Sequence, residues 1–198
     1  MSPSDAAARD EAAHGAILLA LARGSVVRAL GVGDDAPEAE SAAPWLAEPG
    51  ATFVTLMKGG DLRGCVGSLE AHRPLRDDVR DNARAAAFRD NRFPPLSREE
   101  LPEVSFEVSL LSPPRPLAPT ARESVALARL RPGLDGVVLD LHGQRSTFLP
   151  QVWEQIPEPR DFLAQLKRKA GLRPDFWSRE LRLSVYSVEK WKEREGEG

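Results

Sequence analysis

Residues 52–68 of this 198-residue chain, with the sequence TFVTLMKGGDLRGCVGS, decide the fold. A β-branched and apolar run at residues 52–58 is followed by Gly59-Gly60 and then by a second run at residues 61–67. Glycine adopts the positive φ angles that tight connections between strands require. The pattern therefore predicts a β-hairpin with its turn at the two glycines.

The second strand of this hairpin carries the single cysteine of the chain, Cys65. Because side chains alternate along a strand, we expect Cys65 to share one face with Arg63 and Gly67. The other face would carry Leu62, Gly64 and Val66. Glycines inside a strand often mark close approach by a ligand or another backbone. A nearby guanidinium favours the thiolate form of a cysteine, so this strand is a candidate reactive site.

The same residues also fit a purely structural interpretation. A free cysteine is among the residue types most often buried, where it behaves as a small hydrophobic side chain. The glycines would then form a bulge, and Arg63 would pair with a structural carboxylate. The reactive interpretation requires the guanidinium of Arg63 to point toward Cys65, and the sequence leaves both interpretations open.

The composition is that of an ordinary globular protein, with 41% hydrophobic and 29% charged residues. A formal net charge of −3 provides no basic field, so we do not expect a nucleic-acid partner. No apolar run approaches the roughly 20 residues of a membrane span, and the first residues lack the features of a signal peptide. We therefore expect a cytoplasmic protein that is not associated with membranes.

The rest of the chain alternates between helical and strand-like patterns. Apolar residues recur at helical spacing in residues 10–30, and a glycine- and proline-rich loop occupies residues 31–50. A helix is expected after Pro74, and residues 104–110 alternate as a strand does. The second half repeats this order, with helices at residues 124–130 and 161–170, a hairpin at residues 137–149 and a closing strand at residues 180–191.

Hairpins and helices mix without regular βαβ units, which predicts an α+β fold with a mainly antiparallel sheet and flanking helices. We expect one domain at residues 10–192, with an N-terminal helix at residues 10–30. Its two lobes would span roughly residues 51–116 and 117–192. Residues 193–198 form a charged tail that we expect to be disordered.

Few other motifs of catalysis or ligation are present. The three histidines lie far apart, and no cysteine or histidine pair has zinc spacing, so we expect no metal. The chain has no phosphate-binding P-loop and no Gly-x-Ser-x-Gly nucleophile elbow, and we expect no cofactor. A nucleophilic Cys65 would need a proton acceptor, for which His72, His142 and Glu107 are candidates. Glu107 could instead be a solvated strand residue or the ion-pair partner of Arg63.

Several motifs in the same order resemble those of the AMMECR domain family. Residues 62–67, LRGCVG, resemble the family signature Leu-Arg-Gly-Cys-Ile-Gly, with valine in place of isoleucine. The resemblance extends over about residues 17–191. Further matches are AAAF at residues 85–88, DNRFPPL at 90–96, VSLLSPP at 108–114, GLDG at 133–136, FLPQV at 148–152 and KAGL at 169–172.

The resemblance implies an α+β fold of two lobes that arose from a duplicated strand-and-helix unit. It places the signature cysteine at Cys65, with Arg63, Gly64 and Gly67 matching around it. Bacterial and archaeal members are called AmmeMemoRadiSam system protein A, because they accompany a Memo-like protein and a radical SAM protein. Two residues of a second motif, Arg92 and Phe93, are expected to face the same cleft.

Two functions fit these observations. In the first, the protein is an enzyme or enzyme component that acts on a small molecule or peptide-like substrate in a cleft between the lobes. Cys65 would be the nucleophile or redox thiol, Arg63 would stabilise the thiolate or bind an anionic group, and Glu107 or a histidine would transfer protons. Substrate contacts would come from Gly64, Gly67, Arg92 and Phe93.

In the second, the protein is a non-catalytic scaffold. The Cys65 strand would then be a docking surface for the Memo-like and radical SAM proteins, and the thiol would have no chemical role.

Overall fold

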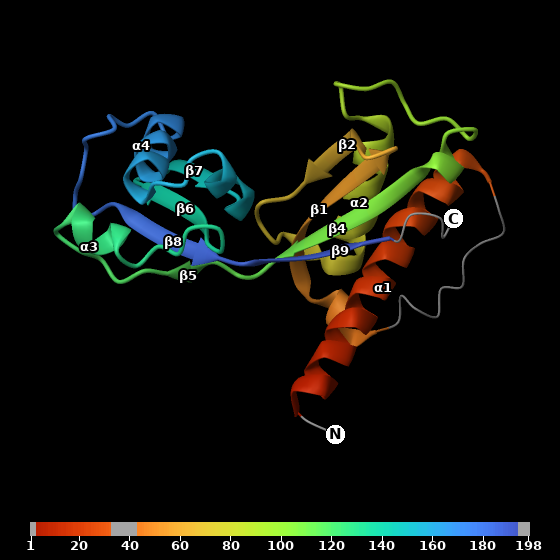
Figure 1. Ribbon diagram of the computed structural model, residues 1–198, viewed down its shortest axis with the longest axis horizontal. Helices are drawn as coiled ribbons and strands as arrows, with labels where there is room; N and C mark the ends of the chain where they lie inside the picture. The colour runs from red at the N-terminus through yellow and green to blue at the C-terminus, as the bar shows by residue number, and fades with distance from the viewer. Residues whose placement is uncertain (1–2, 33–42, 194–198) are drawn as a thin grey trace. The chain divides into compact units, whose positions relative to one another are not determined.

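Two mainly antiparallel sheets, each with its own helices, organise the chain (Figure 1). The computed structural model describes residues 3–32 and 43–193. One unit comprises residues 1–111 and 189–198, and the other comprises residues 112–188. Apart from Glu193, the tail expected to be disordered lies outside the described residues, as do residues 33–42 of the expected loop. The predicted α+β class with antiparallel strands and flanking helices is confirmed.

The sheet of the first unit is built around the predicted hairpin. β1 (Pro49–Lys58) and β2 (Asp61–Gly67) pair antiparallel. Gly59 and Gly60 connect them with φ angles of 58° and 87°. Positive φ at both central residues belongs to the turn type whose twist matches that of the flanking strands. The hairpin and its turn are therefore confirmed at the predicted residues.

Three more strands complete this sheet. β4 (Val104–Leu111) pairs antiparallel with β1 on the side away from β2. The short β3 (Arg73–Pro74) pairs with the first residues of β1. β9 (Val188–Lys192) lies beside β4, so the strand order is β2-β1-β4-β9 and β2 forms one edge.

One face of this sheet is covered by two helices. α1 (Pro3–Leu30) packs against α2 (Leu75–Phe88) and β4, and α2 packs against β1 and β2. A 3₁₀ helix, η2 (Pro44–Ala47), adds Leu46 to the same core. Fully buried aliphatic and aromatic side chains contribute about 1.5–3 kcal/mol each to such packing. The largest of them in this core are Leu18, Leu46, Leu56 and Phe106.

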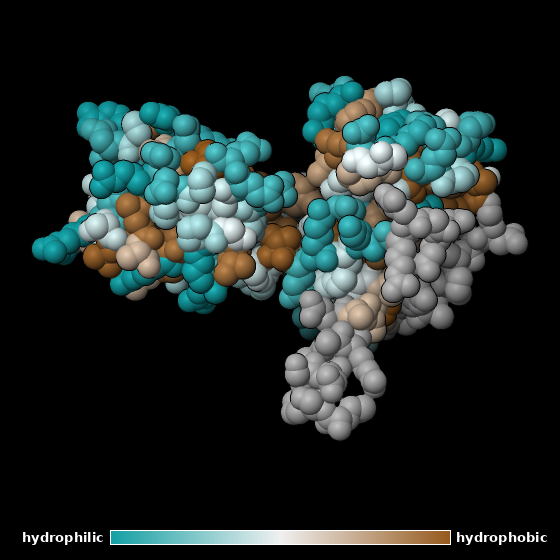
Figure 2. All heavy atoms as spheres, in the orientation of Figure 1, coloured by the Kyte–Doolittle hydropathy of each residue, from teal (hydrophilic) through white to brown (hydrophobic). Residues whose placement is uncertain are grey.

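Helix α1 contradicts the expectation that no segment is long and apolar enough to cross a membrane. Residues Ala12–Leu30 have the length and the mean hydropathy, 1.3, that a span could have. In the structure, Leu18, Ala22 and Val26 of this segment are fully buried in the core of the first unit. The visible faces of both units carry mainly hydrophilic residues (Figure 2). One stripe of α1 thus packs into the core of the first unit.

The second unit contains a sheet with the order β5-β8-β6-β7. β6 (Gly136–Leu141) and β7 (Gln144–Phe148) form the second predicted hairpin. β8 (Arg182–Tyr186) pairs antiparallel with β6, and β5 (Arg115–Pro116) pairs with β8.

Helices and a ring stack build the core of the second unit. The helices are α3 (Glu123–Leu127) and α4 (Pro159–Lys169), with a 3₁₀ helix, η4 (Pro150–Glu154), before α4. The ring of Trp153 stacks on that of Phe162, with 3.7 Å between centroids. The aliphatic residues around this stack include Leu139, Leu163, Leu166, Leu183 and Val185.

The two sheets share one topology. In each, a hairpin is followed by a helix and by a strand that pairs with the first hairpin strand, giving β2-β1-β4 and β7-β6-β8. The fourth strands are exchanged, because β5 follows β4 in sequence but joins the second sheet, and β9 follows β8 but joins the first. The closing strand expected at residues 180–191 is therefore two strands, one in each sheet, that separate at Ser187.

The returning strand β9 is held on the first unit by Trp191 and by Glu193, the residue that follows the strand. Nε and Nη2 of Arg23 in α1 donate to the two carboxylate oxygens of Glu193 at 2.7 and 2.6 Å. The backbone N–H of Glu193 donates to the carbonyl of Phe106 at 3.0 Å. Trp191 packs directly on Gly15 of α1, where a Cβ would overlap the indole ring.

Two glycines of β2 lie against bulky neighbours. A Cβ at Gly64 would overlap the backbone carbonyl oxygen of Ala86 in α2. A Cβ at Gly67 would instead overlap the ring of Phe53, a side chain that is only partly buried. A packed helix backbone cannot move by itself, whereas a partly exposed ring can rotate.

We predict that Gly64→Ala lowers the free energy of unfolding by about 3 kcal/mol, the upper end of the usual cost of overpacking. Gly67→Ala should cost about 1 kcal/mol, because the obstacle is a movable side chain. Urea denaturation followed by circular dichroism measures both. Equal losses in the two variants would show that the contact with α2 does not constrain β2.

Candidate functional site around Cys65

A bulge at Arg63 changes the faces that β2 presents. The register against β1 shifts after Leu56, so that Arg63 has no partner on that strand. One extra residue in a strand reverses the side-chain alternation on one side of the bulge. Leu62 therefore shares the face of Cys65, and Arg63 is buried, 7% exposed, on the helix-covered side. The expectation that Arg63 and Cys65 lie on one face is wrong for this reason.

Arg63 forms an ion pair with Glu100. Its Nε and Nη2 donate to the two carboxylate oxygens of Glu100 at 3.2 and 2.9 Å, and Nη2 also donates to the carbonyl of Pro94 at 2.9 Å. The hydrogen bonds from Arg63 lower the pKa of Glu100 to about 2. The geometry thus corresponds to the structural interpretation of Arg63, and the carboxylate partner is Glu100 rather than Glu107.

The loop before β4 positions Glu100 for this contact. Ser97 and Glu100 form a capping box, in which the N–H of Ser97 donates to the carboxylate and the N–H of Glu100 donates to Ser97 Oγ, each at 3.3 Å. A 3₁₀ helix, η3 (Leu101–Glu103), follows and leads into β4. Lys58 at the end of β1 also donates to Glu100 at 3.2 Å. Glu100 therefore links β1, β2 and the loop.

The thiol of Cys65 lies on the face of the sheet opposite to α1 and α2. Its partner on β1 is Thr55, whose hydroxyl donates to the Cys65 sulfur at 3.3 Å. Cys65 is partly exposed. The sulfur is thus neither sealed in the core nor in contact with Arg63, and its polar neighbour in the sheet is a hydroxyl group.

Asp90 and Arg92 hold the backbone of Cys65 from the edge of the sheet. Asp90 Oδ2 accepts the N–H of Cys65 at 2.9 Å, and Arg92 Nη2 donates to the carbonyl of Cys65 at 3.3 Å. Arg92 also donates from Nε and Nη2 to both carboxylate oxygens of Asp90, at 2.9 and 2.7 Å. The two side chains therefore satisfy the pair of backbone groups that a neighbouring antiparallel strand would satisfy.

This ion pair also brings an exposed guanidinium group to the backbone of Cys65. Hydrogen bonds from Arg92 hold the pKa of Asp90 well below its usual range. The same bonds raise the pKa of Arg92, and the negative charge of a Cys65 thiolate would raise it further. The Arg92 side chain is 52% exposed, so that a ligand can reach it. Of the two arginines singled out in the sequence, Arg92 is the cation that contacts Cys65.

Phe93 lies close to both arginines. The guanidinium carbons of Arg63 and Arg92 are 5.8 and 5.6 Å from its ring centroid, within the range of cation–π contacts. The structure therefore brings Arg92 and Phe93 of the second motif to the strand that carries Cys65. Gly64 is turned toward α2 instead, and Gly67 lies beneath the ring of Phe53.

Glu107 shares the face of Cys65 but lies two strands away from it. It is opposite Thr55 in the register of β1 and β4. Its carboxylate forms an ion pair with Lys190 of β9 at 2.5 Å. Among the hydrogen bonds of the described residues, none joins Glu107 to Cys65. A row of side chains from Cys65 through Thr55 and Glu107 to Lys190 therefore crosses the first sheet.

The histidines have other surroundings. His14 packs on Trp45, with 4.4 Å between ring centroids, and His72 is exposed after β2. His142, at the tip of the second hairpin, lies 3.0 Å from Glu180. Within residues 3–32 and 43–193, no group of three or more acidic, histidine or cysteine side chains is arranged to hold a metal ion.

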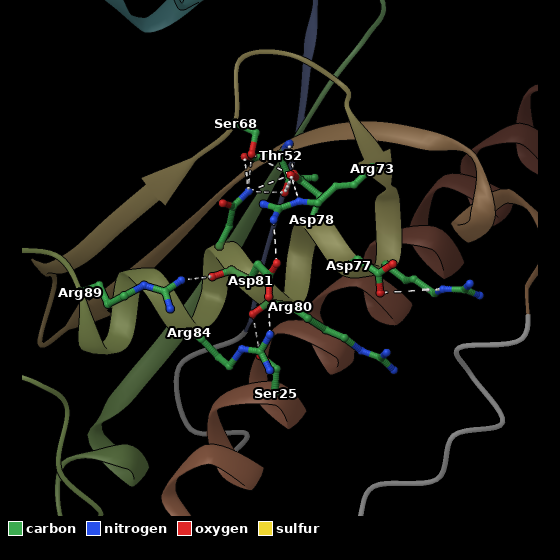
Figure 3. Close-up of polar contacts among 12 residues, drawn as sticks. Ser25, Thr52, Ser68, Arg73, Asp77, Asp78, Arg80, Asp81, Arg84 and Arg89 are labelled. Carbon is green, nitrogen blue, oxygen red and sulfur yellow. Dashed lines mark hydrogen bonds and ion pairs between the residues drawn. The ribbon is translucent and has the colours of Figure 1, made fainter.

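A separate polar cluster around Asp78 of α2 has a structural role. Asp78 is fully buried and accepts hydrogen bonds from the N–H and hydroxyl of Thr52 at 2.8 and 2.7 Å. It also accepts from Ser68 at 2.7 Å, from Arg73 at 2.9 Å and from Asn82 at 2.9 Å (Figure 3). These bonds attach both ends of the first hairpin to α2.

Two residues that contact Cys65, Asp90 and Thr55, are not among the predicted site residues. Asp90 belongs to the same motif as Arg92 and Phe93, and this proximity was a usable signal. Thr55 could not be identified from the sequence in this way. Counting outward from the Gly-Gly turn places Val54 opposite Cys65, and the bulge at Arg63 shifts the partner to Thr55.

Replacing Arg63 by methionine removes the main partner of Glu100. We predict that Arg63→Met lowers the free energy of unfolding by about 2 kcal/mol at pH 7, the scale of hydrogen bonds to charged groups. The folded-state pKa of Glu100, about 2, lies below its ordinary value of 4.5. The stabilisation is therefore present above pH 4.5 and is lost as the pH falls toward 2. Urea denaturation should show that the difference in free energy of unfolding between Arg63→Met and the unmodified protein shrinks as the pH falls from 4.5 toward 2.

Arg173→Met is the matched control for this variant. Arg173 pairs with Asp175 at 3.2 Å, and both side chains are highly exposed. Exposed pairs contribute little, so this variant should stay within about 0.5 kcal/mol of the unmodified protein. If Arg63→Met lowers the free energy of unfolding by the same amount at pH 7 and at pH 2.5, the role given to Glu100 is contradicted.

Archaeal proteins are similar to this chain over most of its length. A protein of Methanothermobacter thermautotrophicus is 39% identical over 146 residues, which cover 71% of this chain and 74% of the relative. Protein MK0488 of Methanopyrus kandleri is 35% identical over 195 residues, which cover 93% and 91%. Neither name states an activity.

A solved structure and a family model agree with these relatives. The crystal structure of the uncharacterized protein PH0010 from Pyrococcus horikoshii matches with a TM-score of 0.72 and 30% sequence identity, over 90% of this chain and 91% of that one. The sequence model of the AMMECR1 family matches residues 19–191, which include both sheets and the Cys65 strand. The chain therefore belongs to the AMMECR1 family.

Proposed function

We propose that the protein is an enzyme, or a component of one, that holds a small-molecule or peptide-like substrate at Cys65. The observation that carries the proposal is the setting of Cys65. Its sulfur is partly exposed and accepts a hydroxyl hydrogen bond from Thr55, while Asp90 and Arg92 hold its backbone. A reactive cysteine requires such an accessible position near a positive charge.

In this proposal Cys65 is the nucleophile of an acyl transfer. Its sulfur bonds to a carbonyl carbon of the substrate while the thiol proton goes to the proton acceptor, and the bond from that carbon to the leaving group breaks as the leaving group takes up that proton. Water then cleaves the thioester, which releases the acyl group as a carboxylic acid and restores the thiol. The hydroxyl of Thr55 donates to the sulfur, and the guanidinium of Arg92 lies at the backbone carbonyl of the same residue. Arg92 takes the role expected of Arg63, because Arg63 is committed to Glu100. Its exposed side chain also suits binding of an anionic group of the substrate. Glu107, two strands away on the same face of the sheet, is the proposed proton acceptor and would act through a bridging water.

A scaffold is the second candidate function. It is favoured by the packing roles of Arg63 and Gly64, which explain much of the signature motif without catalysis. It is also favoured by Leu62 and Leu69, which are 39% and 42% exposed beside the Cys65 strand. A docked protein would cover such apolar side chains. The proposed partners are a Memo-like protein and a radical SAM protein, and the proposed location is the cytoplasm, where a free thiol stays reduced.

Alkylation of Cys65 tests the enzyme proposal directly, because the chain has one cysteine. We predict that iodoacetamide modifies the native protein at pH 7 faster than it modifies a model thiol, as measured by intact mass. Iodoacetate, which carries a carboxylate, probes Arg92. The ratio of iodoacetate to iodoacetamide rates should fall about fivefold in Arg92→Gln, the effect of about 1 kcal/mol between exposed charges. Using the ratio cancels changes in thiolate fraction.

Arg173→Gln provides the control, since it also removes an exposed arginine from an aspartate pair. Its rate ratio should equal that of the unmodified protein. A thiol that reacts only after denaturation would reject the enzyme proposal and leave the scaffold. In that case Leu62→Ser should weaken capture of the two proposed partners from cell extract.

A further inference from the structure

We infer that the second unit carries a separate pocket for a small molecule with a carboxylate or phosphate group beside an apolar part. The pocket has a volume of about 230 Å³. Three segments line it: the lead into β5, the turn before β6 and the end of β8. All of its lining residues belong to the second unit, and none belongs to the Cys65 site.

A positioned guanidinium forms one wall of the pocket. Arg131 donates from Nε and Nη2 to Oδ1 of Asp135 at 3.0 and 2.6 Å, and its backbone N–H donates to Oδ2 at 2.9 Å. Asp135 is 1% exposed, and the indole of Trp153 donates to its carbonyl at 2.7 Å. The buried aspartate therefore fixes Arg131, whose Nη1 has no hydrogen-bond partner among the described residues.

A second guanidinium, that of Arg115 in β5, also lines the pocket. Within the described part of the chain, its side chain has no ion-pair or hydrogen-bond partner. Two arginines against one aspartate leave the pocket with a net charge of +1. Guanidinium groups bind carboxylate and phosphate oxygens through parallel hydrogen bonds, so an oxyanion satisfies both donors.

The remaining walls are apolar and aromatic. Pro113 and Val185 line the pocket together with Tyr186. The ring of Tyr186 packs on Gly136, and its hydroxyl donates to the carbonyl of Phe148 at 3.1 Å. Because its polar end is already bonded, the ring offers the pocket a fixed apolar surface. The volume is below the roughly 300–1,000 Å³ of pockets for drug-sized ligands, so the ligand is small.

Tyr186 supplies the reporter for a test, because it is the single tyrosine of the chain. Protein made with 3-fluorotyrosine gives one ¹⁹F signal, at the pocket wall. We expect saturable shifts of this signal with benzoate and phenyl phosphate, a weaker response to inorganic phosphate and none to benzyl alcohol. Comparing the first two probes separates a carboxylate ligand from a phosphate ligand.

Arg115→Gln should raise the Kd for the better probe at least about tenfold, the effect of losing one charge-assisted hydrogen bond. Arg122→Gln is the matched control, since Arg122 is an exposed arginine of the same unit outside the pocket. Arg131→Lys keeps the positive charge but loses the planar guanidinium group, and it should also weaken binding of the probe. Cys65→Ser should leave the Kd unchanged, which separates this site from the proposed enzyme function.

Three outcomes would overturn the inference. One is the absence of a saturable shift with any anion up to concentrations on the order of 10 mM. Another is equal weakening by Arg115→Gln and Arg122→Gln, which would show general ionic attraction. The third is loss of binding in Cys65→Ser, which would assign the ligand to the other site.

Discussion

The contact between Gly64 and the carbonyl of Ala86 is the constraint on which the first unit depends. It brings α2 so close to β2 that a Cβ would not fit between them. The bulge next to this contact lets Arg63 turn under the sheet toward Glu100. Cys65, two residues further along, consequently emerges on the opposite face. The close approach of β2 to α2 thus places the buried guanidinium of Arg63 and the thiol of Cys65 on opposite faces of the sheet.

The different roles of Arg63 and Arg92 follow from that separation. Arg63 is buried and satisfies the loop carboxylate of Glu100, so its charge serves the fold. Arg92 is half exposed and joins Asp90 in binding the backbone of Cys65. Because Asp90 and Arg92 occupy the backbone N–H and C=O groups of Cys65 at the strand edge, they protect β2 from pairing with another chain. The thiol of Cys65 stays accessible.

Local patterns predicted most elements, and long-range contacts account for what they missed. The hairpin was predictable because alternation and the Gly-Gly turn lie within residues 52–67. The partner of Arg63 was not, because the capping box that presents Glu100 is 37 residues away in sequence. Asp90 is also distant from Cys65 in sequence, by 25 residues, and its place in the motif of Arg92 and Phe93 was the one signal for it. The break between β8 and β9 at Ser187 cannot be seen in the sequence, since the residues on both sides of it alternate like one continuous strand.

The exchange of β5 and β9 has a consequence for synthesis on the ribosome. The outer edge of β4 is paired by residues that are translated only after the whole second unit. At typical elongation rates, residues 112–187 take roughly 4–15 seconds to appear. Throughout that interval the nascent chain exposes an unpaired edge, which is a template for pairing with the wrong partner. The nascent polypeptide, rather than the mature one, is therefore the form of this protein that most needs a chaperone.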